Sequence, residues 1–337
     1  MRKVSNSNRQ QCRTRITAST VLLCMALLLA PCTTWAQKVT AAITGKVTDA
    51  SGAAIAGAKV TANDLERGTT QQTVTNSDGD YNIPQVPVGT YTVRVENAGF
   101  QTAQQSNLTL VLNQVARIDF QMQVGNVTTA VEVNSAVPLL QTESTDIGQI
   151  IDARTNTALP LATRNYVQLT LLAAGTVHPD TSLFTSAQTP ANAGRPYVNG
   201  NREQENNFML DGMDNNQVSD NLVGYAPSVD AIQEFNEITS NAPAEFGNYM
   251  GGIVNTSIKS GTNQFHGDAF EFFRNNVLNA NQWSNNFTDS PRAALRWNEF
   301  GGVLGGPIKK DKIFFFVDYQ GQRFDNPNTT GAVSLLT

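Results

Sequence analysis

Short runs of alternating apolar and polar residues fill the chain between residues 41 and 124, with turn-forming residues between the runs. Alternation with a period of two is typical of strands that bury one face, and clusters of Asp, Asn and Gly favour tight turns. We therefore expect an antiparallel β-sandwich, in which Tyr91, Val93 and Val95 share a buried face. The predicted strands cover residues 43–47, 59–62, 69–75, 81–83, 89–95, 101–108 and 115–122.

One of the turns, at residues 76–80, contains two carboxylates, Asp78 and Asp80, on either side of Gly79. Such oxygens suit calcium, but the segment lacks the twelve-residue loop and the distal bidentate Glu of an EF-hand. A plain turn is the favoured interpretation.

Several of these segments occur in a characteristic order. Together they resemble the carboxypeptidase-regulatory-like family, which implies a transthyretin-like or starch-binding-like β-sandwich without catalytic activity of its own. The segments that carry the resemblance are Gly45–Asp49, Gly57–Val60, Thr75–Tyr81 and Pro87–Tyr91.

Residues 125–134 form a Val- and Thr-rich linker after the sandwich. Its alternation is compatible with an extended segment that adds to the sheet edge of another protein, although a last strand of the sandwich would have the same pattern. Position and composition resemble the TonB box, through which TonB-dependent receptors engage the energy-transducing TonB protein of the inner membrane. The resemblance assigns that role to Thr128, Thr129, Ala130, Val131, Glu132 and Val133.

From residue 135 to 259 the pattern becomes mixed and predicts a small α/β domain. In one expected helix, Tyr166, Leu169 and Leu172 recur at three-residue spacing and form one buried stripe. The expected helices are 145–153, 165–172 and 228–234, and the expected strands are 197–200 and 207–212.

Five motifs in this region resemble the plug domain of TonB-dependent receptors. The resemblance implies a domain that sits inside a barrel and blocks it. One motif contains the adjacent glycines Gly251 and Gly252, which let the backbone turn tightly or pack close to a neighbour. The motifs are Asn199–Arg202, Phe208–Gly212, Ile232–Phe235, Ala244–Gly247 and Gly251–Asn255.

Residues 260–337 have the pattern of membrane-crossing β-strands. The run 312–320 is about nine residues long, which suffices to cross an outer membrane as a tilted strand. Plausible earlier strands cover 268–274 and 298–304, and a compact turn covers 305–311. In the run, Ile313, Phe315, Val317 and Tyr319 should face lipid, and Phe314, Phe316, Asp318 and Gln320 should point inward.

A soluble sheet edge is the alternative for this region, but an exposed strand with three consecutive phenylalanines invites aggregation. At most three or four strands fit before Thr337, and open strand edges cannot satisfy their backbone groups in hydrocarbon. We therefore expect the chain to be a fragment that holds the incomplete start of a β-barrel.

The N-terminus predicts export. Five basic residues precede an apolar run at 18–30 that is too short for a transmembrane helix, and the small residues Thr34 and Ala36 follow at the positions that a signal peptidase reads. Residues 1–36 are therefore interpreted as a signal peptide, cleaved between Ala36 and Gln37. An uncleaved anchor is disfavoured by the length, and a lipoprotein is disfavoured because Pro31 precedes Cys32.

Removing this segment changes the composition. All three cysteines lie within it, and the remainder has 18 basic and 28 acidic residues, a net charge of −10. An acidic chain argues against a nucleic-acid partner. Without cysteines, and with only His178 and His266 as histidines, the mature chain has no disulfide framework or evident metal site, and we expect no cofactor.

No nucleophile elbow or phosphate-binding glycine loop is present, so we expect no enzyme. Asp211 and Asp214 could be imagined as a carboxylate pair, but their surroundings are rich in turn signals, and a structural loop is favoured.

The fold class expected is mainly β: a sandwich, an α/β plug and the first barrel strands. The expected function is that of the N-terminal portion of an outer-membrane receptor for energy-coupled uptake of a nutrient such as an oligosaccharide or a peptide. Its partners would be TonB and the outer membrane, although the fragment alone would stay periplasmic. The alternative is a secreted or periplasmic module for carbohydrate binding or adhesion.

Overall fold

The structure is a computed structural model of the chain, and it describes residues 40–125, 130–132, 144–161, 163–178, 195–247 and 249–325. The predicted signal peptide with Ala36 and Gln37, and three residues of the predicted coupling segment, Thr128, Thr129 and Val133, lie outside the described residues. Within the described residues, strands dominate, which agrees with the mainly β class expected from the sequence.

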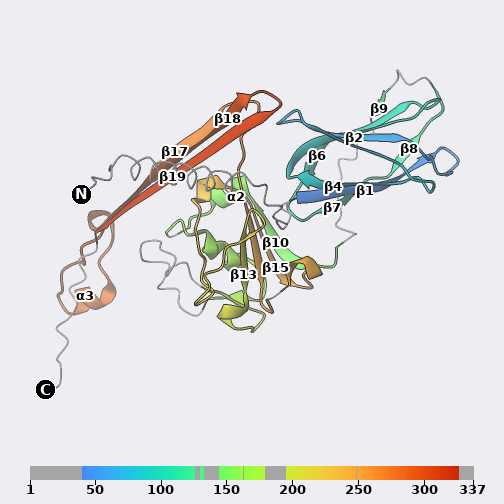
Figure 1. The fold of residues 1–337 in the computed structure, drawn as a ribbon. Helices are drawn as coiled ribbons and strands as arrows, with labels where there is room; N and C mark the ends of the chain where they lie inside the picture. Colours follow the sequence, from blue (N-terminus) through green and yellow to red (C-terminus); the bar gives the residue numbers. More distant parts are fainter. Residues whose placement is uncertain are drawn as a thin grey trace, which may run out of the picture. The chain divides into compact units, whose positions relative to one another are not determined.

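The first part of the chain is a β-sandwich (Figure 1). One sheet contains β4 (Asp80–Pro87), β1 (Thr40–Asp49) and β7 (Val115–Arg117), with β8 (Phe120–Met122) paired to β1 further along. The other sheet contains, in order, β3 (Thr70–Val74), β2 (Lys59–Asp64), β5 (Gly89–Glu96), β6 (Thr102–Leu110) and β9 (Ala130–Glu132). The last predicted strand, 115–122, is thus two short strands.

Period-two alternation builds the core of the sandwich. Along β1 every second residue from Ala41 to Val47 is buried, and β5 buries Tyr91, Val93 and Val95 as the sequence predicted. Burying such side chains contributes about 1.5–3 kcal/mol each relative to an exposed position.

Gly45 of β1 allows a close approach between strands. A Cβ atom there would lie 1.8 Å from the carbonyl oxygen of Ile118 and 2.9 Å from the ring of Tyr81, whose hydroxyl donates to that same carbonyl at 2.7 Å. Only glycine leaves room for this contact.

The turn at 76–80 needs no bound ion to explain its shape. The backbone amides of Asp78 and Asp80 both donate to the side-chain oxygen of Asn76, at 2.9 and 2.8 Å, and Gly79 has φ of +77°. An Asn side chain that caps its own backbone, followed by a left-handed Gly, is ordinary turn chemistry.

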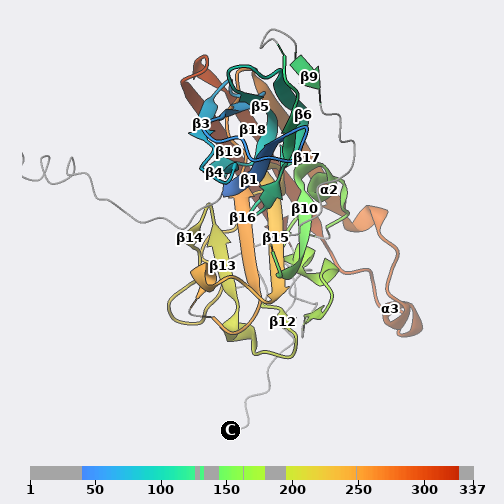
Figure 2. The same ribbon diagram turned by 90° about the vertical axis from the view of Figure 1, so that its right-hand side faces the viewer.

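The middle of the chain forms a second unit around a five-stranded sheet, called the central sheet below. Its strands lie side by side in Figure 2, in the order β10 (Ile147–Asp152), β15 (Ile232–Ser240), β16 (Ile253–Ile258), β13 (Asn207–Leu210) and β14 (Met213–Asp214). Around it lie α2 (Ala153–Ala158), η1 (Tyr166–Leu172), β11 (Thr176–Val177), β12 (Tyr197–Val198), η4 (Glu203–Glu205), η5 (Val229–Ala231) and η6 (Ala244–Phe246).

Two predicted helices of this unit are wrong. Residues 147–152 of the predicted helix 145–153 form strand β10, which pairs with β15. Helix α2 begins only after Asp152, whose side chain caps the helix by accepting a hydrogen bond from the amide of Thr155. In the predicted helix 228–234, Ser228 caps a single 3-10 turn and Ile232 already begins β15.

The predicted helix 165–172 is a 3-10 helix, η1. Tyr166 and Leu169 are buried as expected, whereas Leu172 is 52% exposed because the helix ends there. The buried stripe is therefore shorter than predicted.

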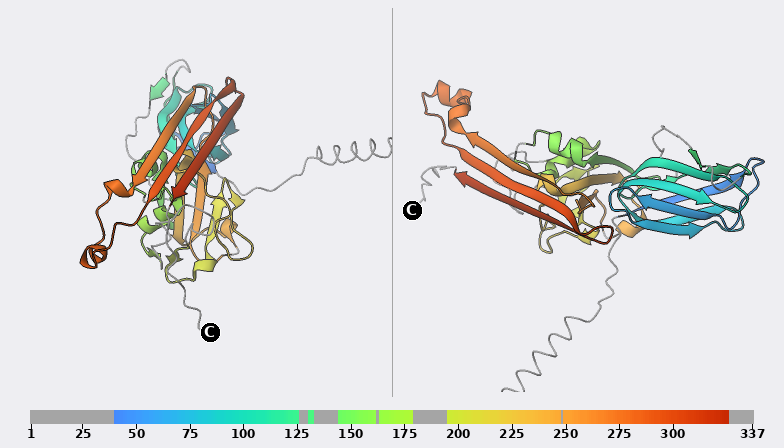
Figure 3. Two further views of the ribbon diagram at one scale, coloured as in Figure 1. Left: turned by 90° about the vertical axis from the view of Figure 1, so that its left-hand side faces the viewer. Right: turned by 90° about the horizontal axis from the view of Figure 1, so that it is seen from above.

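The last part is an antiparallel three-stranded sheet, called the terminal sheet below, whose strands are seen side by side in the left view of Figure 3. It contains β17 (His266–Asn275), β18 (Arg296–Lys309) and β19 (Ile313–Asp325). The connection from β17 to β18 contains η7 (Asn276–Leu278) and α3 (Trp283–Phe287). The three predicted strands are confirmed, and each is longer than expected. Among the described residues, no helix combines the length and the apolar character needed to cross a membrane.

Candidate functional site

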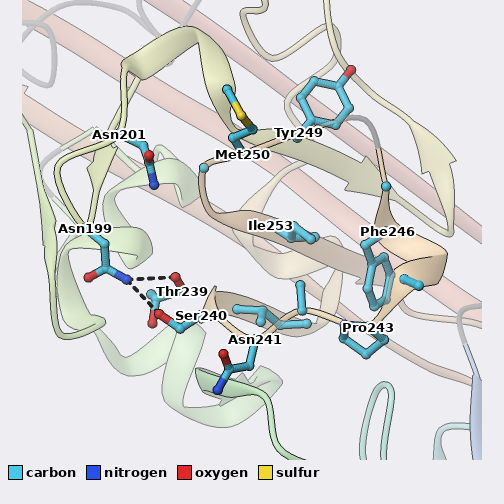
Figure 4. Close-up of a pocket in the computed structure, with 15 residues that line it drawn as sticks. Asn199, Asn201, Thr239, Ser240, Asn241, Pro243, Phe246, Tyr249, Met250 and Ile253 are labelled. Carbon is cyan, nitrogen blue, oxygen red and sulfur yellow. Dashed lines mark hydrogen bonds between the residues drawn. The ribbon is translucent and has the colours of Figure 1, made fainter.

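A cavity of about 450 Å³ opens where β15 ends, at residue 240 (Figure 4). Its floor is apolar and consists of Ile238, Phe246 and Ile253, which belong to a small buried cluster. Its rim is polar and carries Asn199, Asn201, Thr239, Ser240, Asn241 and Tyr249. The cavity thus combines a hydrophobic base with amide and hydroxyl groups around it.

Asn199 and Asn241 give the rim its shape. Both have positive φ, +50° and +56°, a conformation that Asn tolerates better than most residues. The side-chain amide of Asn199 donates to the carbonyl oxygen of Thr239 at 2.8 Å and to the hydroxyl of Ser240 at 3.0 Å, which ties the loop after β12 to the end of β15.

No acidic or basic side chain is among the described residues that line this cavity. Recognition there would rest on amide and hydroxyl hydrogen bonds and on apolar contact rather than on ion pairing. The arrangement suits a neutral ligand with several hydrogen-bonding groups.

Gly251 of the cavity wall and the adjacent Gly252 let the backbone pack close to its neighbours, as the sequence predicted. A Cβ on Gly252 would lie 2.7 Å from a methyl of Val198, and one on Gly251 would lie 2.5 Å from the side-chain oxygen of Asn206. The loop can therefore pack directly against its neighbours only because both residues lack a side chain.

Asp211 and Asp214 accept hydrogen bonds from two separate backbone segments. Asp211 accepts a hydrogen bond from the amide of Ile258 at 2.9 Å, and Asp214 accepts one from the amide of Asn216 at 2.8 Å. These contacts fit the structural loop favoured by the sequence. In the part of the chain that the structure describes, no cluster of three or more His, Cys, Asp or Glu side chains is placed to hold a metal.

A buried carboxyl group, Glu237 of β15, was not predicted from the sequence. Its residue is fully buried, one oxygen accepts a hydrogen bond from the hydroxyl of Thr176 at 2.8 Å, and the other has no partner. Burial raises the pKa of Glu237 to about 8, because the charged form loses its water. The side chain is therefore protonated at neutral pH.

One face of the terminal sheet contacts the central unit. The hydroxyl of Ser228 donates to Asp318 at 2.7 Å, and Gln320 donates to Glu299 at 2.6 Å on the same face. Asp318 and Gln320 were both predicted to point inward, and these contacts agree with that prediction.

Arg164 is the centre of this contact. Its guanidinium pairs with Asp230, lies 3.9 Å from Glu299, and stacks over Phe272 with 4.1 Å to the ring centroid. The guanidinium is also 5.0 Å from the ring centroid of Phe270. A cation between two carboxylates and two aromatic rings links the central unit to β17 and β18 through charge and stacking together.

Sequence reasoning missed Arg164. The available signal was weak: it is the only charged residue between Arg154 and Asp180, and it follows an apolar segment. An isolated charge in such a setting requires a partner, but the partner lies more than sixty positions away and no local pattern indicates it.

The opposite face of the terminal sheet exposes large apolar side chains, with the charged Glu271 among them opposite Phe300. Leu304 pairs with Val317, and Gly302 pairs with Tyr319, so these residues share that face. Leu304, Ile313, Val317 and Tyr319 are all about half exposed or more, and the exposed ring of Phe265 lies 6.3 Å from the ring of Phe315. The predicted alternation of the last strand is therefore present in the structure.

The described part of the predicted coupling segment, Ala130–Glu132, is strand β9. It pairs in parallel with β6 at the edge of the second sandwich sheet, opposite Thr102, Ala103 and Gln104. The alternative that the sequence left open, a last strand of the sandwich, is thus realised in this conformation of the chain.

The class of protein follows from comparison with known families. Residues 42–123 match the Carboxypeptidase regulatory-like domain, and residues 257–337 match the Outer membrane beta barrel domain. The resemblance to TonB-dependent outer-membrane receptors with an N-terminal carboxypeptidase-regulatory-like domain is confirmed.

A curated relative is the TonB-dependent transporter Oar of Myxococcus xanthus, which is a transporter and not an enzyme. It is 29% identical over 344 residues, an alignment that covers 95% of this chain and 30% of the relative. The chain thus spans less than a third of the length of the curated relative that it matches.

Among solved structures, the outer membrane transporter YddB from Escherichia coli is 16% identical, with 47% of this chain and 24% of that chain covered and a TM-score of 0.36. A type II cohesin–X-dockerin complex from Acetivibrio cellulolyticus is 24% identical, with 25% and 58% covered and a TM-score of 0.21. Likeness at these scores is too slight to bear on function.

Proposed function

We propose that this chain is the N-terminal portion of a receptor in the outer membrane that imports a nutrient with energy delivered by TonB. Residues 135–259 act as the plug, residues 260–337 begin the barrel, and residues 128–133 form the segment that engages TonB. Residues 1–36 direct export, with cleavage between Ala36 and Gln37.

The two-faced terminal sheet carries this proposal. Its polar face holds Glu299, Asp318 and Gln320 against the central unit, and its other face exposes mostly apolar side chains, with Glu271 opposite Phe300. Strands that alternate between a lipid face and a polar lumen have this composition. A central unit bound to the polar face occupies the place of a plug.

The position of the cavity supports uptake from outside the cell. Short turns of outer-membrane barrels face the periplasm and long connections face the exterior. Residues 310–312 join β18 to β19 and 276–295 join β17 to β18, so β17 begins on the periplasmic side. The chain enters β17 soon after the Ile258 end of the central sheet, whereas the cavity lies at the opposite end, near Ser240.

The nutrient that best fits the cavity is neutral and rich in hydroxyl or amide groups, such as an oligosaccharide or a peptide segment. The rim offers side-chain amides from Asn201 and Asn241, which can both donate and accept, and the side-chain oxygen of Asn199, whose N–H groups already bond Thr239 and Ser240. The apolar floor and Tyr249 would contact the less polar faces of such a ligand.

The rival function is a secreted module that binds carbohydrate through the sandwich. The apolar face of the terminal sheet argues against it, since a water-soluble protein with so many exposed large side chains would aggregate. Cell fractionation separates the two: recovery of the intact receptor in the periplasm, with polysaccharide binding confined to residues 41–124, would favour the rival.

Coupling to TonB is tested by disulfide trapping in cells that make the intact receptor. Cysteines at single positions from Thr129 to Val133 should trap a TonB protein that carries a cysteine in its strand-pairing region. Cysteines at Lys59 and Thr61, on a strand inside the sandwich sheet, are the matched controls. Equal trapping from both sets would rule out residues 128–133 as the coupling segment.

A further inference from the structure

The segment proposed to engage TonB already has a partner within its own chain. Strand β9 pairs with β6 through Thr102↔Ala130, Ala103↔Val131 and Gln104↔Glu132. Strand β6 is nine residues long, and β9 pairs with three of them. A parallel ladder of this length is weaker per residue than an antiparallel one and can be displaced.

The edge of β6 is followed directly by a second pairing. Gln101 and Phe100, the residues that precede Thr102, pair with the chain just before the linker. The amide of Gln101 donates to the carbonyl of Gln123 at 2.8 Å, and Phe100 forms a bridge with Val124. A third contact, from the amide of Gly125 to the carbonyl of Gly99 at 3.1 Å, fixes the start of the linker.

Strand addition to another protein uses the same backbone donors and acceptors that a sheet edge uses. A partner that pairs with the whole segment from 128 to 133 needs it as one continuous extended strand. On β6, residues Ala130–Glu132 already use the backbone donors and acceptors of one edge, so a partner that pairs with that edge must displace β6. The two modes of pairing therefore compete.

We infer that the edge of β6 is a docking site that binds the coupling segment when TonB does not, so that the sandwich and TonB compete for the same strand. The inference rests on the proposed role of residues 128–133. It makes the N-terminal sandwich a regulator of coupling, because the sandwich sets the fraction of receptors whose segment is free. TonB must displace β6 before it can pull.

A disulfide across the ladder tests the exchange. In the Gln104→Cys/Glu132→Cys variant, oxidation ties β9 to β6 at positions that face each other. The matched control, Thr61→Cys/Gln72→Cys, ties β2 to β3 in the same sheet without touching β9. The native cysteines, at positions 12, 24 and 32, lie in the predicted signal peptide and do not interfere.

The readout is capture of the purified periplasmic domain of TonB by the exported chain, with and without reductant. Oxidation should lower capture by the Gln104→Cys/Glu132→Cys variant at least tenfold, reduction should restore it, and the control should bind equally in both states. Equal capture of TonB by the oxidised and the reduced Gln104→Cys/Glu132→Cys variant would overturn the inference, because TonB would then bind while β9 stays paired with β6.

Hydrogen exchange separates this inference from the proposed coupling role. The amides of Ala130–Glu132 should be protected in the free chain, and the amides of Thr102–Gln104 that face β9 should lose protection when TonB takes the strand. Absence of protection in the free chain would overturn the docking. Protection without any TonB capture by the wild-type chain would instead refute the coupling role and leave β9 as an ordinary sandwich strand.

Discussion

At the scale of single residues, the central unit keeps a carboxyl group where water cannot reach it. Glu237 accepts one hydrogen bond from Thr176 and has a pKa near 8, and Glu234 on the same strand has its pKa raised to about 7, chiefly by burial. Both carboxyls hold their proton longer in the folded state than in the unfolded state, where the usual value is near 4.5. The folded central sheet is therefore coupled to pH.

The sign of this coupling is definite. Below pH 4.5 both states are protonated and the full stability is present. As pH rises, the unfolded chain releases its protons first, so the free energy of unfolding falls until the folded pKa is passed. Between pH 5 and 8, Glu237 alone should remove roughly 2–4 kcal/mol, since one pKa unit corresponds to about 1.4 kcal/mol.

The variant Glu237→Gln should flatten this pH dependence while keeping the acceptor for Thr176. Hydrogen exchange of the β15 and β16 amides from pH 5 to 8, corrected for intrinsic rates, gives the opening free energy at each pH. Thr176→Val is the control, because it removes the hydrogen bond and leaves the carboxyl. A Gln variant with the slope of the wild type would show that Glu237 is not the group that titrates.

Residues such as Glu237 and Arg164 show the limit of sequence reasoning at this scale. Nearly every residue from Ile232 to Ile238 of β15 is buried, and the hydrogen-bond partner of Glu237 is Thr176 of β11, which is distant in sequence. Arg164 likewise depends on Asp230 and Glu299. Partners supplied by tertiary contact leave no local pattern.

At the scale of strands and helices, the sequence predicted most where one face of a strand is buried. Strands β1 and β5 alternate strictly, β19 alternates from Val317 to Gln320, and each strand was predicted within about five residues of its bounds. Strand β10 was mistaken for a helix because Ile147, Ile150 and Ile151 have helical spacing. In the structure Ile147 is exposed and Ile151 is buried, since pairing with β15 overrides the local pattern.

The alternation of β19 makes a prediction about membrane assembly. Val317 pairs with the apolar Leu304 on the exposed face of the terminal sheet, whereas Asn298 pairs on the same face with Arg323, which is already charged. In the intact receptor, Val317→Arg should cost about 2–4 kcal/mol by placing a charge in hydrocarbon. Asn298→Arg should cost little.

The amount of heat-modifiable, folded receptor in the outer-membrane fraction measures this difference. Val317→Leu controls for the change in size. If Val317→Arg and Asn298→Arg assembled equally well, the exposed face of the terminal sheet would not be a lipid face.

At the scale of the whole molecule, a few buried charges link the central unit to the terminal sheet. Removing Arg164 would leave Asp230 and Glu299 buried without their cation, which typically costs about 3–5 kcal/mol. We expect Arg164→Ala to loosen the central unit within the intact receptor, and Arg164→Lys to retain part of the contact because its charge remains while its planar fork is lost.

Limited proteolysis of the intact receptor in outer-membrane vesicles reports on this contact. Cleavage within residues 145–259 should be fastest for Arg164→Ala, intermediate for Arg164→Lys and slowest for the wild type. The exposed Arg154→Ala is the matched control. Unchanged cleavage of Arg164→Ala would show that the cluster does not hold the two parts together.

The length of β19 determines how far this strand would extend beyond the apolar layer of the membrane. Thirteen residues at about 3.4 Å each give roughly 44 Å, and a tilt of about 45° leaves roughly 31 Å along the membrane normal, against an apolar band of about 25 Å. In the proposed receptor, the strand is therefore taller than the apolar band is thick, and Arg323, near its end, lies close to the membrane surface. In the same receptor, the β17–β18 connection would lie on the outer side of the lipid, with the stacked and exposed rings of Trp283 and Phe287 facing the exterior.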